Sequence, residues 1–268
     1  VRNLERTITS VLRKCARKIA SGEAENVSVT GTGLEKLLGP RMVKPEFLNR
    51  TNAIGIANGL AWTSIGGETL PIEVQVMDNG SGKITVTGSL GDVMKESAQL
   101  AITYVRVHAE EYGIDPERLK KCDLHIHAPE GAVPKDGPSA GVTLTTALVS
   151  CLSGIPVRGD VAMTGEITLH GNVLPIGGLR EKSMAAYREG MKTVLIPKDN
   201  VPDLYEVDDE VKKNLTFLPM SDLAQVLNAA LLKPKSVSAR HPHPAKKAKP
   251  VEAAIPPTPE KPKPGAVC

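Results

Sequence analysis

Between residues 53 and 232 the chain interleaves short strand-like segments with helical ones, and this pattern constrains the fold more than any other feature. Strands are expected first at Ala53–Trp62, Thr69–Met77 and Lys83–Thr87. The run Asp78-Asn79-Gly80-Ser81-Gly82 between the last two predicts a β-hairpin, because Asn-Gly pairs adopt the positive φ angles of tight turns. We therefore expect residues 53–232 to form a domain of strands and helices.

The same changes in the period of apolar residues predict the later helices and strands. Further strands are predicted at Asp123–Ala128, Val161–Met163, Ile167–Leu169, Thr193–Ile196 and Leu215–Leu218. Helices are predicted at Asp92–Tyr112, Ala140–Leu152, Leu179–Glu189 and Asp222–Leu232. Ser221 is the expected N-cap of the last helix.

A separate helical segment precedes this region. Asn3–Ala20 has apolar residues at helical spacing with Arg and Lys between them, which predicts an amphipathic helix. A short strand at Asn26–Thr30 and a short helix at Leu34–Leu38 should follow, and residues 40–52 are typical of a linker. Since the chain starts at Val1 inside an expected helix, we expect it to be a piece of a longer protein.

Residues 233–268 have the composition of a disordered tail. They hold nine of the 21 prolines, with seven Lys, one Arg and two Glu. The tail thus carries a local charge of +6, which leaves −3 on residues 1–232 of a chain whose net charge is +3. The basic balance is therefore a property of the tail, and we expect no nucleic-acid partner.

The spacing of the cysteines and the hydropathy of the chain indicate its cellular compartment. Cys15, Cys122, Cys151 and Cys268 stand far apart, which fits free thiols and argues against a disulfide framework or a metal site. The sequence contains no apolar run of transmembrane length and opens with no signal peptide. We expect a cytoplasmic location and no membrane partner.

The run Gly137-Pro138-Ser139-Ala140-Gly141 surrounds a serine with residues of little bulk. It matches the G-x-S-x-G pattern of the α/β-hydrolase nucleophile elbow, but such a serine follows directly on a strand, and here a loop precedes it. The only later histidine before the tail is His170, and its nearest preceding acids, Asp160 and Glu166, leave too little room for the usual order. These residues argue against a Ser-His-Asp triad.

A Ser-Lys pair fits better. A lysine takes a proton from serine only when its amine is neutral, and burial favours that form. Lys182 projects at the margin of the apolar face of its predicted helix, close to the N-terminus, where the helix dipole disfavours a cation. From these residues alone a second interpretation stays open, in which Ser139 is a helix N-cap and Lys182 a surface lysine whose stem lies along the protein.

Several longer motifs resemble those of one family. They are Gly59–Thr63, Thr87–Met94, Pro134–Gly141, Met163–Thr168 and Gly171–Gly178, followed by Glu181-Lys182. Together they resemble the proteolytic domain of the Lon proteases, which are ATP-dependent bacterial enzymes, and the likeness extends over roughly residues 1–232. The resemblance implies an α/β fold of the Lon type at residues 53–232, with mixed short-strand sheets and helices. It also implies that residues 1–39 are the end of the helical subdomain of an AAA+ module.

The resemblance assigns roles to four residues. Ser139 would be the nucleophile and Lys182 the general base, Thr164 would hydrogen-bond the lysine amine, and Asp136 would shape the loop before the serine. The implied activity is a serine endopeptidase that cleaves unfolded, damaged or regulatory proteins through an acyl-enzyme, in a hexameric ring. The alternative is a non-catalytic Lon-like module for binding or assembly.

The chain also departs from the family. No G-x-x-x-x-G-K-[ST] loop is present, so we expect no cofactor in this chain, and ATP and Mg belong to the full-length protein. Arg2 stands where the AAA+ module carries a sensor arginine. Without the rest of that module we expect it to be an ordinary helix-start residue.

Other residues receive structural interpretations. His125 and His127 alternate on a strand and point to one face, but a metal site needs a third ligand that the sequence does not supply. Trp62 is expected to pack in the core or against the sheet, and Glu73 to lie on a solvated strand face. Cys151 is expected to be a small buried apolar residue.

Overall fold

The computed structural model describes residues 2–40, 51–63, 66–129 and 134–232. Most of the expected linker at residues 40–52 lies outside the described residues, and so does the expected tail at residues 233–268. No described helix is both long enough and apolar enough to cross a membrane.

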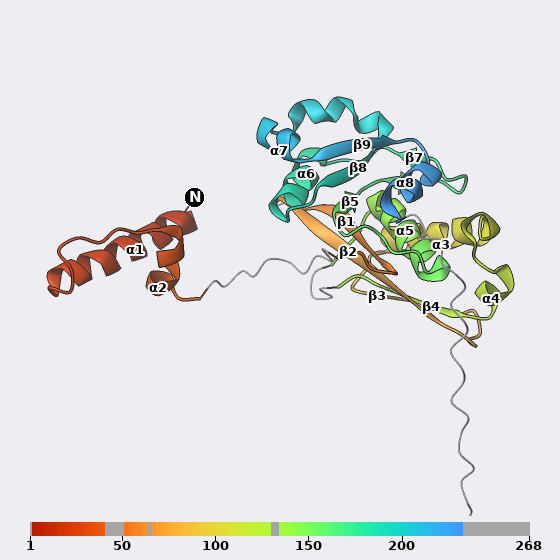
Figure 1. Cartoon of the computed structure of the whole chain (residues 1–268), viewed down its shortest axis with the longest axis horizontal. Coiled ribbons are helices and arrows are strands. Elements are labelled where there is room, and N and C mark those ends of the chain that lie inside the picture. The colour runs from red at the N-terminus through yellow and green to blue at the C-terminus, as the bar shows by residue number, and fades with distance from the viewer. Residues whose placement is uncertain (1, 41–50, 64–65, 130–133, 233–268) are drawn as a thin grey trace, which may run out of the picture. The chain divides into compact units, whose positions relative to one another are not determined.

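Seven strands form one sheet in the order β3-β4-β2-β1-β5-β8-β9 (Figure 1). They are β1 (Ile56–Thr63), β2 (Gly66–Met77), β3 (Ile84–Thr87), β4 (Asp123–His127), β5 (Val161–Met163), β8 (Thr193–Pro197) and β9 (Thr216–Met220). β2 pairs antiparallel with β1 and β4, and the other neighbouring pairs are parallel. A separate two-stranded sheet joins β6 (Glu166–Ile167) to β7 (Val173–Leu174).

Helices cover both faces of the large sheet (Figure 1). One face carries α3 (Asp92–Val107), α5 (Gly141–Ser153) and α8 (Leu223–Ala230), whereas the other carries α6 (Leu179–Arg188) and α7 (Asp209–Asn214). This mixed arrangement confirms the expected α/β fold class.

Strand β8 shows how one segment serves both layers of the core. Leu195 belongs to the cluster on the α5 side, whereas Val194 and Ile196 belong to the cluster on the α6 side. Successive side chains of a strand point to opposite faces, so a continuous apolar run is the pattern of a strand covered on both sides.

The predicted hairpin of β2 and β3 is wrong, because β4 lies between these strands and pairs with both. The carboxylate of Asp123, the first residue of β4, accepts hydrogen bonds from Ser81 N at 2.7 Å and Lys83 N at 2.8 Å. Hydrogen bonds from the backbone of Lys83 and Ser81 lower the pKa of Asp123. The chain does reverse at Gly80. The backbone N–H groups of this turn bind the carboxylate of Asp123 from β4, and β2 and β3 do not pair with each other.

One predicted strand is absent from the described residues, and two predicted helix boundaries differ from the structure. The expected strand Asn26–Thr30 is wrong, because this segment pairs with no described strand and an unpaired strand leaves its backbone groups without partners. The predicted helix Asp92–Tyr112 ends at Val107, and a 3₁₀ turn follows at Glu110–Tyr112. The N-cap of α8 is Asp222 and not Ser221, because its carboxylate accepts from Gln225 N at 2.9 Å.

Short elements were the ones that sequence patterns missed. They are α4 (Pro116–Lys120), α7 and β7, none longer than six residues. The predicted strand Ile167–Leu169 is displaced to β6, and a tight turn at Leu169 and His170 joins β6 to its partner β7. Elements of this length carry too few residues for a period to be recognised.

Residues 2–40 contain α1 (Arg2–Ala20) and α2 (Leu34–Leu38). The predicted amphipathic helix is confirmed in α1, where Cys15 is buried and the amine of Lys14 donates to the carbonyl of Leu37. Much of its apolar face remains exposed, at Leu4, Ile8, Leu12 and Ile19. The assignment of this segment to an AAA+ module stays a prediction.

Both ends of the domain at residues 53–232 are attached to the segment Pro156–Val157, which follows α5. Val157 exchanges two backbone hydrogen bonds with Ala53, at 2.8 and 3.2 Å, and forms a second antiparallel bridge with Leu231. Leu232 N donates to Pro156 O at 2.9 Å. The first and last described residues of the domain are therefore attached to the same segment.

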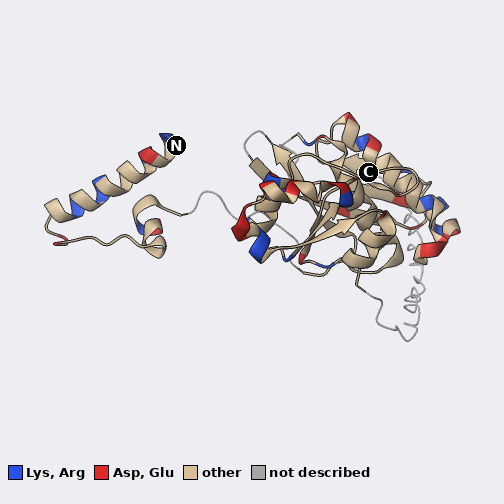
Figure 2. Cartoon of the chain, turned by 90° about the horizontal axis from the view of Figure 1, so that it is seen from above, with Lys and Arg blue, Asp and Glu red and all other residues tan. Residues whose placement is uncertain are grey.

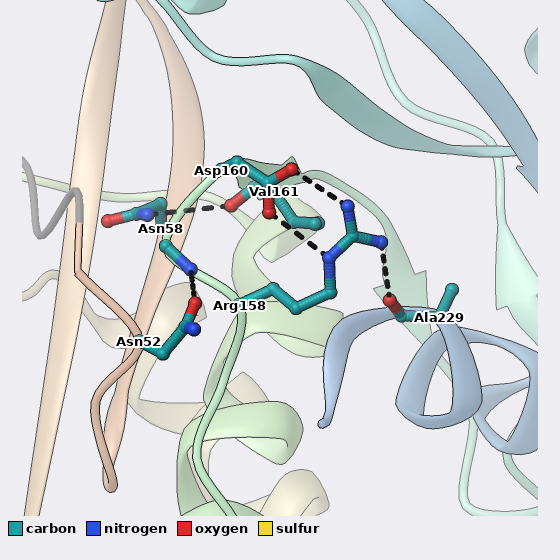
Figure 3. A network of polar contacts seen from close by, with 7 residues as sticks. Asn52, Asn58, Arg158, Asp160, Val161 and Ala229 are labelled. Carbon is teal, nitrogen blue, oxygen red and sulfur yellow. Dashed lines mark hydrogen bonds and ion pairs between the residues drawn. The ribbon is translucent and has the colours of Figure 1, made fainter. Parts of the chain in front are cut away.

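Side chains reinforce this junction (Figure 3). The guanidinium of Arg158 forms a bidentate ion pair with Asp160, at 2.8 and 3.1 Å, and lies 3.4 Å from the carbonyl of Ala229. The side-chain oxygen of Asn52 accepts from Gly159 N at 3.0 Å. Elsewhere on the described surface, basic and acidic residues lie interspersed on the same helices and strands (Figure 2).

Candidate active site

One cleft of about 630 Å³ contains most of the predicted site. Its walls come from the paired ends of β1 and β2, from the loop 134–140 and from the loop 175–177. Ser139, Asp136 and Lys182 all line it. Residues far apart in the sequence are thus brought together as the motifs predict.

Ser139 lies half-buried in a 3₁₀ turn, Pro138–Ala140, directly before the N-terminus of α5. Its carbonyl accepts from Gly165 N at 2.8 Å, which fixes the turn to the segment that follows β5. No side-chain cap is present at the start of α5, so the N-cap interpretation of Ser139 is wrong. Ser139 lines the cleft, and within the described residues its hydroxyl makes no hydrogen bond.

Helix α5 gives the serine a rigid base. Eleven of its 13 residues are buried between the sheet, α3 and α8. Its N-terminal peptide dipoles point at the turn that holds Ser139. A nucleophile at this position would therefore sit on one of the best-packed elements of the domain.

Lys182 is buried in α6, with only 3% of its surface exposed. The helix begins after Gly178, whose φ of 70° is a left-handed conformation that suits glycine. Leu179, Ser183 and Ala186 of the same face are also buried, as the helical projection predicted. The interpretation of Lys182 as a surface lysine is wrong.

Burial lowers the pKa of Lys182 to about 8. The cause is the loss of hydration of the ammonium form, and no ion pair in the described chain offsets it. About a tenth of the amine is therefore neutral at pH 7, and this is the form that accepts a proton.

Thr164 links the lysine to the serine turn. The amine of Lys182 donates to Thr164 Oγ1 at 3.1 Å, and that hydroxyl lies 3.4 Å from the carbonyl of Ser139. Thr164 is only 1% exposed, and its backbone N–H donates to Leu195 O at 3.1 Å. The contact between Thr164 and the lysine amine is the one that the resemblance implies.

Asp136 contacts neither Lys182 nor Thr164. Its carboxylate accepts from Met94 N at 3.0 Å, near the N-terminus of α3, and from Gly137 N at 2.9 Å. A Cβ atom at Gly91 would lie 2.2 Å from the carboxyl carbon of Asp136, so this close packing requires glycine. Asp136 thus ties the loop before Ser139 to α3.

A short backbone ladder adds to this attachment. Lys135 N donates to Ser89 O at 3.0 Å, and Gly91 N donates to Lys135 O at 2.7 Å. The loop before the serine therefore continues the parallel pairing of β3 with β4 beyond the ends of both strands.

The prediction for Trp62 is wrong, because 59% of its surface is exposed and it lines the cleft. The indole packs on the backbone at the start of α6, where a Cβ atom at Gly178 would lie 2.8 Å from Trp62 Cγ. Its neighbour on the same strand face, Leu60, is buried under α6. The pair Gly177-Gly178 was the available signal, since paired glycines often mark a close approach of a bulky side chain.

His125 and His127 share one hydrogen-bond partner. Nε2 of His125 and Nδ1 of His127 lie 2.9 and 2.8 Å from the hydroxyl of Thr87. No group of three His, Cys, Asp or Glu residues is arranged to hold a metal ion in the described ranges. Glu73 is paired with His127 across β2 and β4, on this strand face and outside the cleft lining.

Cys151 and Cys122 do not add a nucleophile to the site. Burial raises the pKa of both thiols, which disfavours the reactive thiolate. Neither residue lines the cleft.

Comparison with known proteins identifies similar sequences across the same region. Residues 28–233 match the family described as the Lon protease (S16) C-terminal proteolytic domain. The chain is 54% identical over 233 residues to the Lon protease of Brevibacillus choshinensis, which covers 87% of this chain and 30% of that protein. Identity to Lon protease 1 of Bacillus subtilis is 49% over 232 residues, or 87% of this chain and 30% of the relative. The chain thus spans less than a third of the length of these curated relatives.

Proposed function

The chain belongs to the Lon protease family and contains its C-terminal proteolytic domain, and from this premise we propose that the cleft is the active site of a serine endopeptidase. The observation that carries the proposal is the burial of Lys182, which leaves a charged amine poorly solvated beside the turn of Ser139. Ser139 is the nucleophile and Lys182 the general base.

The hydrogen-bond capacity of a neutral amine supports these roles. A neutral lysine has N–H donors and one lone pair. Its bond to Thr164 uses a donor, so the lone pair remains to accept the proton of the Ser139 hydroxyl. Thr164 thereby orients the amine without competing for its basic electron pair.

Peptide hydrolysis then proceeds in two stages. Lys182 takes the hydroxyl proton of Ser139 while Oγ attacks the carbonyl carbon of the substrate, which forms a tetrahedral intermediate. The lysine ammonium returns that proton to the leaving amine, and an acyl-enzyme remains on Ser139. In the second stage water attacks this ester and gives a proton to Lys182. The lysine passes that proton to Ser139 Oγ as the bond to the acyl carbon breaks, which releases the carboxylic product and restores the serine.

The negative oxygen of the tetrahedral intermediate needs donors in a fixed position. The backbone N–H groups of Ser139 and Ala140 and the N-terminal dipoles of α5 are the candidates. The contacts of Asp136 and Lys135 with α3 and the loop before it hold this turn in place before substrate arrives.

Function in the full-length protein extends this proposal. We propose that an ATP-driven, Mg-dependent motor outside this chain delivers unfolded, damaged or regulatory proteins to the cleft. We further propose that the proteolytic domains assemble as a hexameric ring in the cytoplasm. The family relation supports these statements.

The test compares the full 268-residue chain with its Ser139→Ala and Lys182→Ala variants. Cleavage of a fluorogenic unfolded peptide and covalent labelling by a small fluorophosphonate are both measured. We expect Ser139→Ala to lose both signals, and Lys182→Ala to lose cleavage and most of the labelling rate. Full activity in either variant would remove the Ser-Lys assignment, whereas peptide binding without any labelling of the wild-type chain would favour the alternative of a non-catalytic binding module.

A further inference from the structure

The cleft wall at Pro175–Gly177 belongs to no helix or strand. It runs from the end of β7 to the start of α6, so neither a sheet ladder nor helical hydrogen bonds hold its backbone. Ile176 stands at the centre of this wall and is partly buried against the core on the α6 side. A wall of this kind needs another support if it is to keep one shape.

Asn200 provides that support. Its side-chain oxygen accepts from Ile176 N at 2.9 Å, and its side-chain nitrogen donates to Ile176 O at 2.8 Å. One amide group thus binds both backbone groups of a single residue, as a neighbouring strand would do. Asn200 itself is only 3% exposed and lies in the 3₁₀ turn Lys198–Asn200 that follows β8.

A third bond orients the amide. Nδ2 of Asn200 also donates to the carboxylate of Asp203 at 2.6 Å. This contact distinguishes the nitrogen from the oxygen, so the oxygen faces the N–H of Ile176 and the nitrogen faces its carbonyl. Neither aspartate nor leucine at position 200 reproduces this set, because one lacks the donors and the other lacks every polar atom.

We propose that Asn200 is a positioning residue for substrate binding, which fixes Ile176 as a rigid apolar wall of the cleft. This inference rests on the proposed peptidase function. Because Asn200 occupies both backbone groups of Ile176, a bound peptide meets the side chain of Ile176 and does not pair with the backbone of this residue as it would with a strand. The wall therefore selects the substrate by apolar shape.

The catalytic groups have supports that do not include the bonds of Asn200. The buried face of α6 and the packing of Trp62 on Gly178 hold Lys182, and the bond from Gly165 N holds the turn of Ser139. Loss of the Asn200 bonds should therefore weaken contacts that substrate and transition state share. Such a loss raises KM and leaves kcat nearly unchanged.

Two variants separate wall positioning from simple stabilisation. Asn200→Asp removes the donor to Ile176 O and puts a second carboxylate next to Asp203, so it should lower both peptide binding and the melting temperature. The double variant Asn200→Asp/Asp203→Asn restores an amide–carboxylate pair between these positions but leaves Ile176 O without its donor. Asn214→Ala is the matched control, because it removes an asparagine bond to a backbone carbonyl, Glu210 O at 2.8 Å, outside the cleft.

We expect KM for a fluorogenic peptide to rise about tenfold in both Asn200 variants, with kcat within about twofold of wild type. The double variant should recover most of the melting temperature and none of the KM. The fluorophosphonate labelling rate of Ser139 should stay within about twofold throughout, because this small reagent needs little of the wall.

Recovery of KM together with the melting temperature would overturn the proposal, and so would an unchanged KM in Asn200→Asp. A fall of kcat and labelling with constant KM would instead assign Asn200 to the support of Lys182 and would equally overturn it. Failure of the peptidase function itself is distinguishable, because the wild-type chain would then show no labelling that depends on Ser139.

Discussion

The amine of Lys182 donates a hydrogen bond to the hydroxyl of Thr164 across 3.1 Å, at a place where neither residue is more than 3% exposed. Thr164 is the only described side chain that this amine binds, so it determines where the lone pair points once the lysine is neutral.

Thr164→Val should reduce kcat about tenfold to a hundredfold with little change in KM, because valine keeps the volume and loses the acceptor. An ammonium group donates stronger hydrogen bonds than a neutral amine, so losing Thr164 destabilises the protonated lysine more. The acidic limb of the kcat/KM profile should move to lower pH by about one unit. Thr103→Val, which removes an exposed hydroxyl bound to Gln99 O at 2.9 Å, should leave the profile unchanged.

The pH dependence of the wild-type chain should follow Lys182. Burial lowers the pKa of this amine to about 8, so peptide cleavage should rise with pH through about 8 as the neutral base forms. A steady-state profile measured on a peptide without titratable groups would check this. A profile that falls over the same range would contradict the role of Lys182 as a base.

The free energy of unfolding should also depend on the titration of Lys182. The pKa of Lys182 is depressed in the folded chain, so the unfolded chain binds more protons between pH 8 and the ordinary lysine value of 10.5. Folding stability from this residue therefore increases with pH across that window and is lowest below it. Lys182→Met should raise the melting temperature at pH 7 while it abolishes activity, and its advantage over wild type should shrink as the pH approaches 10.5.

Gly67→Ala should disturb the site through the backbone of α6. A Cβ atom at this position would lie 1.9 Å from the carbonyl oxygen of Glu181 and 2.9 Å from Lys182 N, so the tip of β2 and the helix must separate. We expect a loss of about 1–3 kcal/mol in the free energy of unfolding and a clear fall in the labelling rate of Ser139. Denaturant unfolding and labelling measure the two effects, and Gly31→Ala, with open space around its Cβ, should change neither.

Asp136→Ala should lower kcat/KM because it removes the acceptor for two backbone N–H groups, those of Met94 and Gly137. Asp136→Asn keeps an acceptor oxygen and loses the negative charge near the N-terminus of α3, so its effect should be smaller. The order of labelling rates, wild type above Asp136→Asn above Asp136→Ala, is the expected result. Equal rates in the three proteins would show that the loop needs no such tie.

The sequence predicted the components of the site better than its walls. Local patterns left Ser139 and Lys182 open between a catalytic pair and a helix cap with a surface lysine, and the longer family motifs were what singled out the pair. Trp62 was misplaced because alternation along a strand predicts which face a side chain lies on, and not where the covering helix ends. Asn200 gave no signal, since its partner Ile176 lies 24 residues earlier and takes part only through its backbone groups.

The hairpin error has a similar origin. The residues Asp78–Gly82 do reverse the chain, and the local turn chemistry was read correctly to that extent. The strand beside β3 is β4. Its first residue, Asp123, accepts a hydrogen bond from Lys83 N although the two residues are 40 positions apart in the sequence. Strand order of this kind is decided by packing between distant segments, which local patterns do not record.

Because both ends of the domain are attached to Val157, they lie next to each other. Ala53 and Leu231 bridge to the same residue, and since neighbouring strands lie about 4.8 Å apart, the two ends are only about 10 Å from each other. A short peptide could join them, and new termini could be opened at the exposed turn Asp78–Asn79. The arrangement of Ser139 and Lys182 therefore does not depend on where the chain of this domain begins and ends. A circular permutant should keep the cleft.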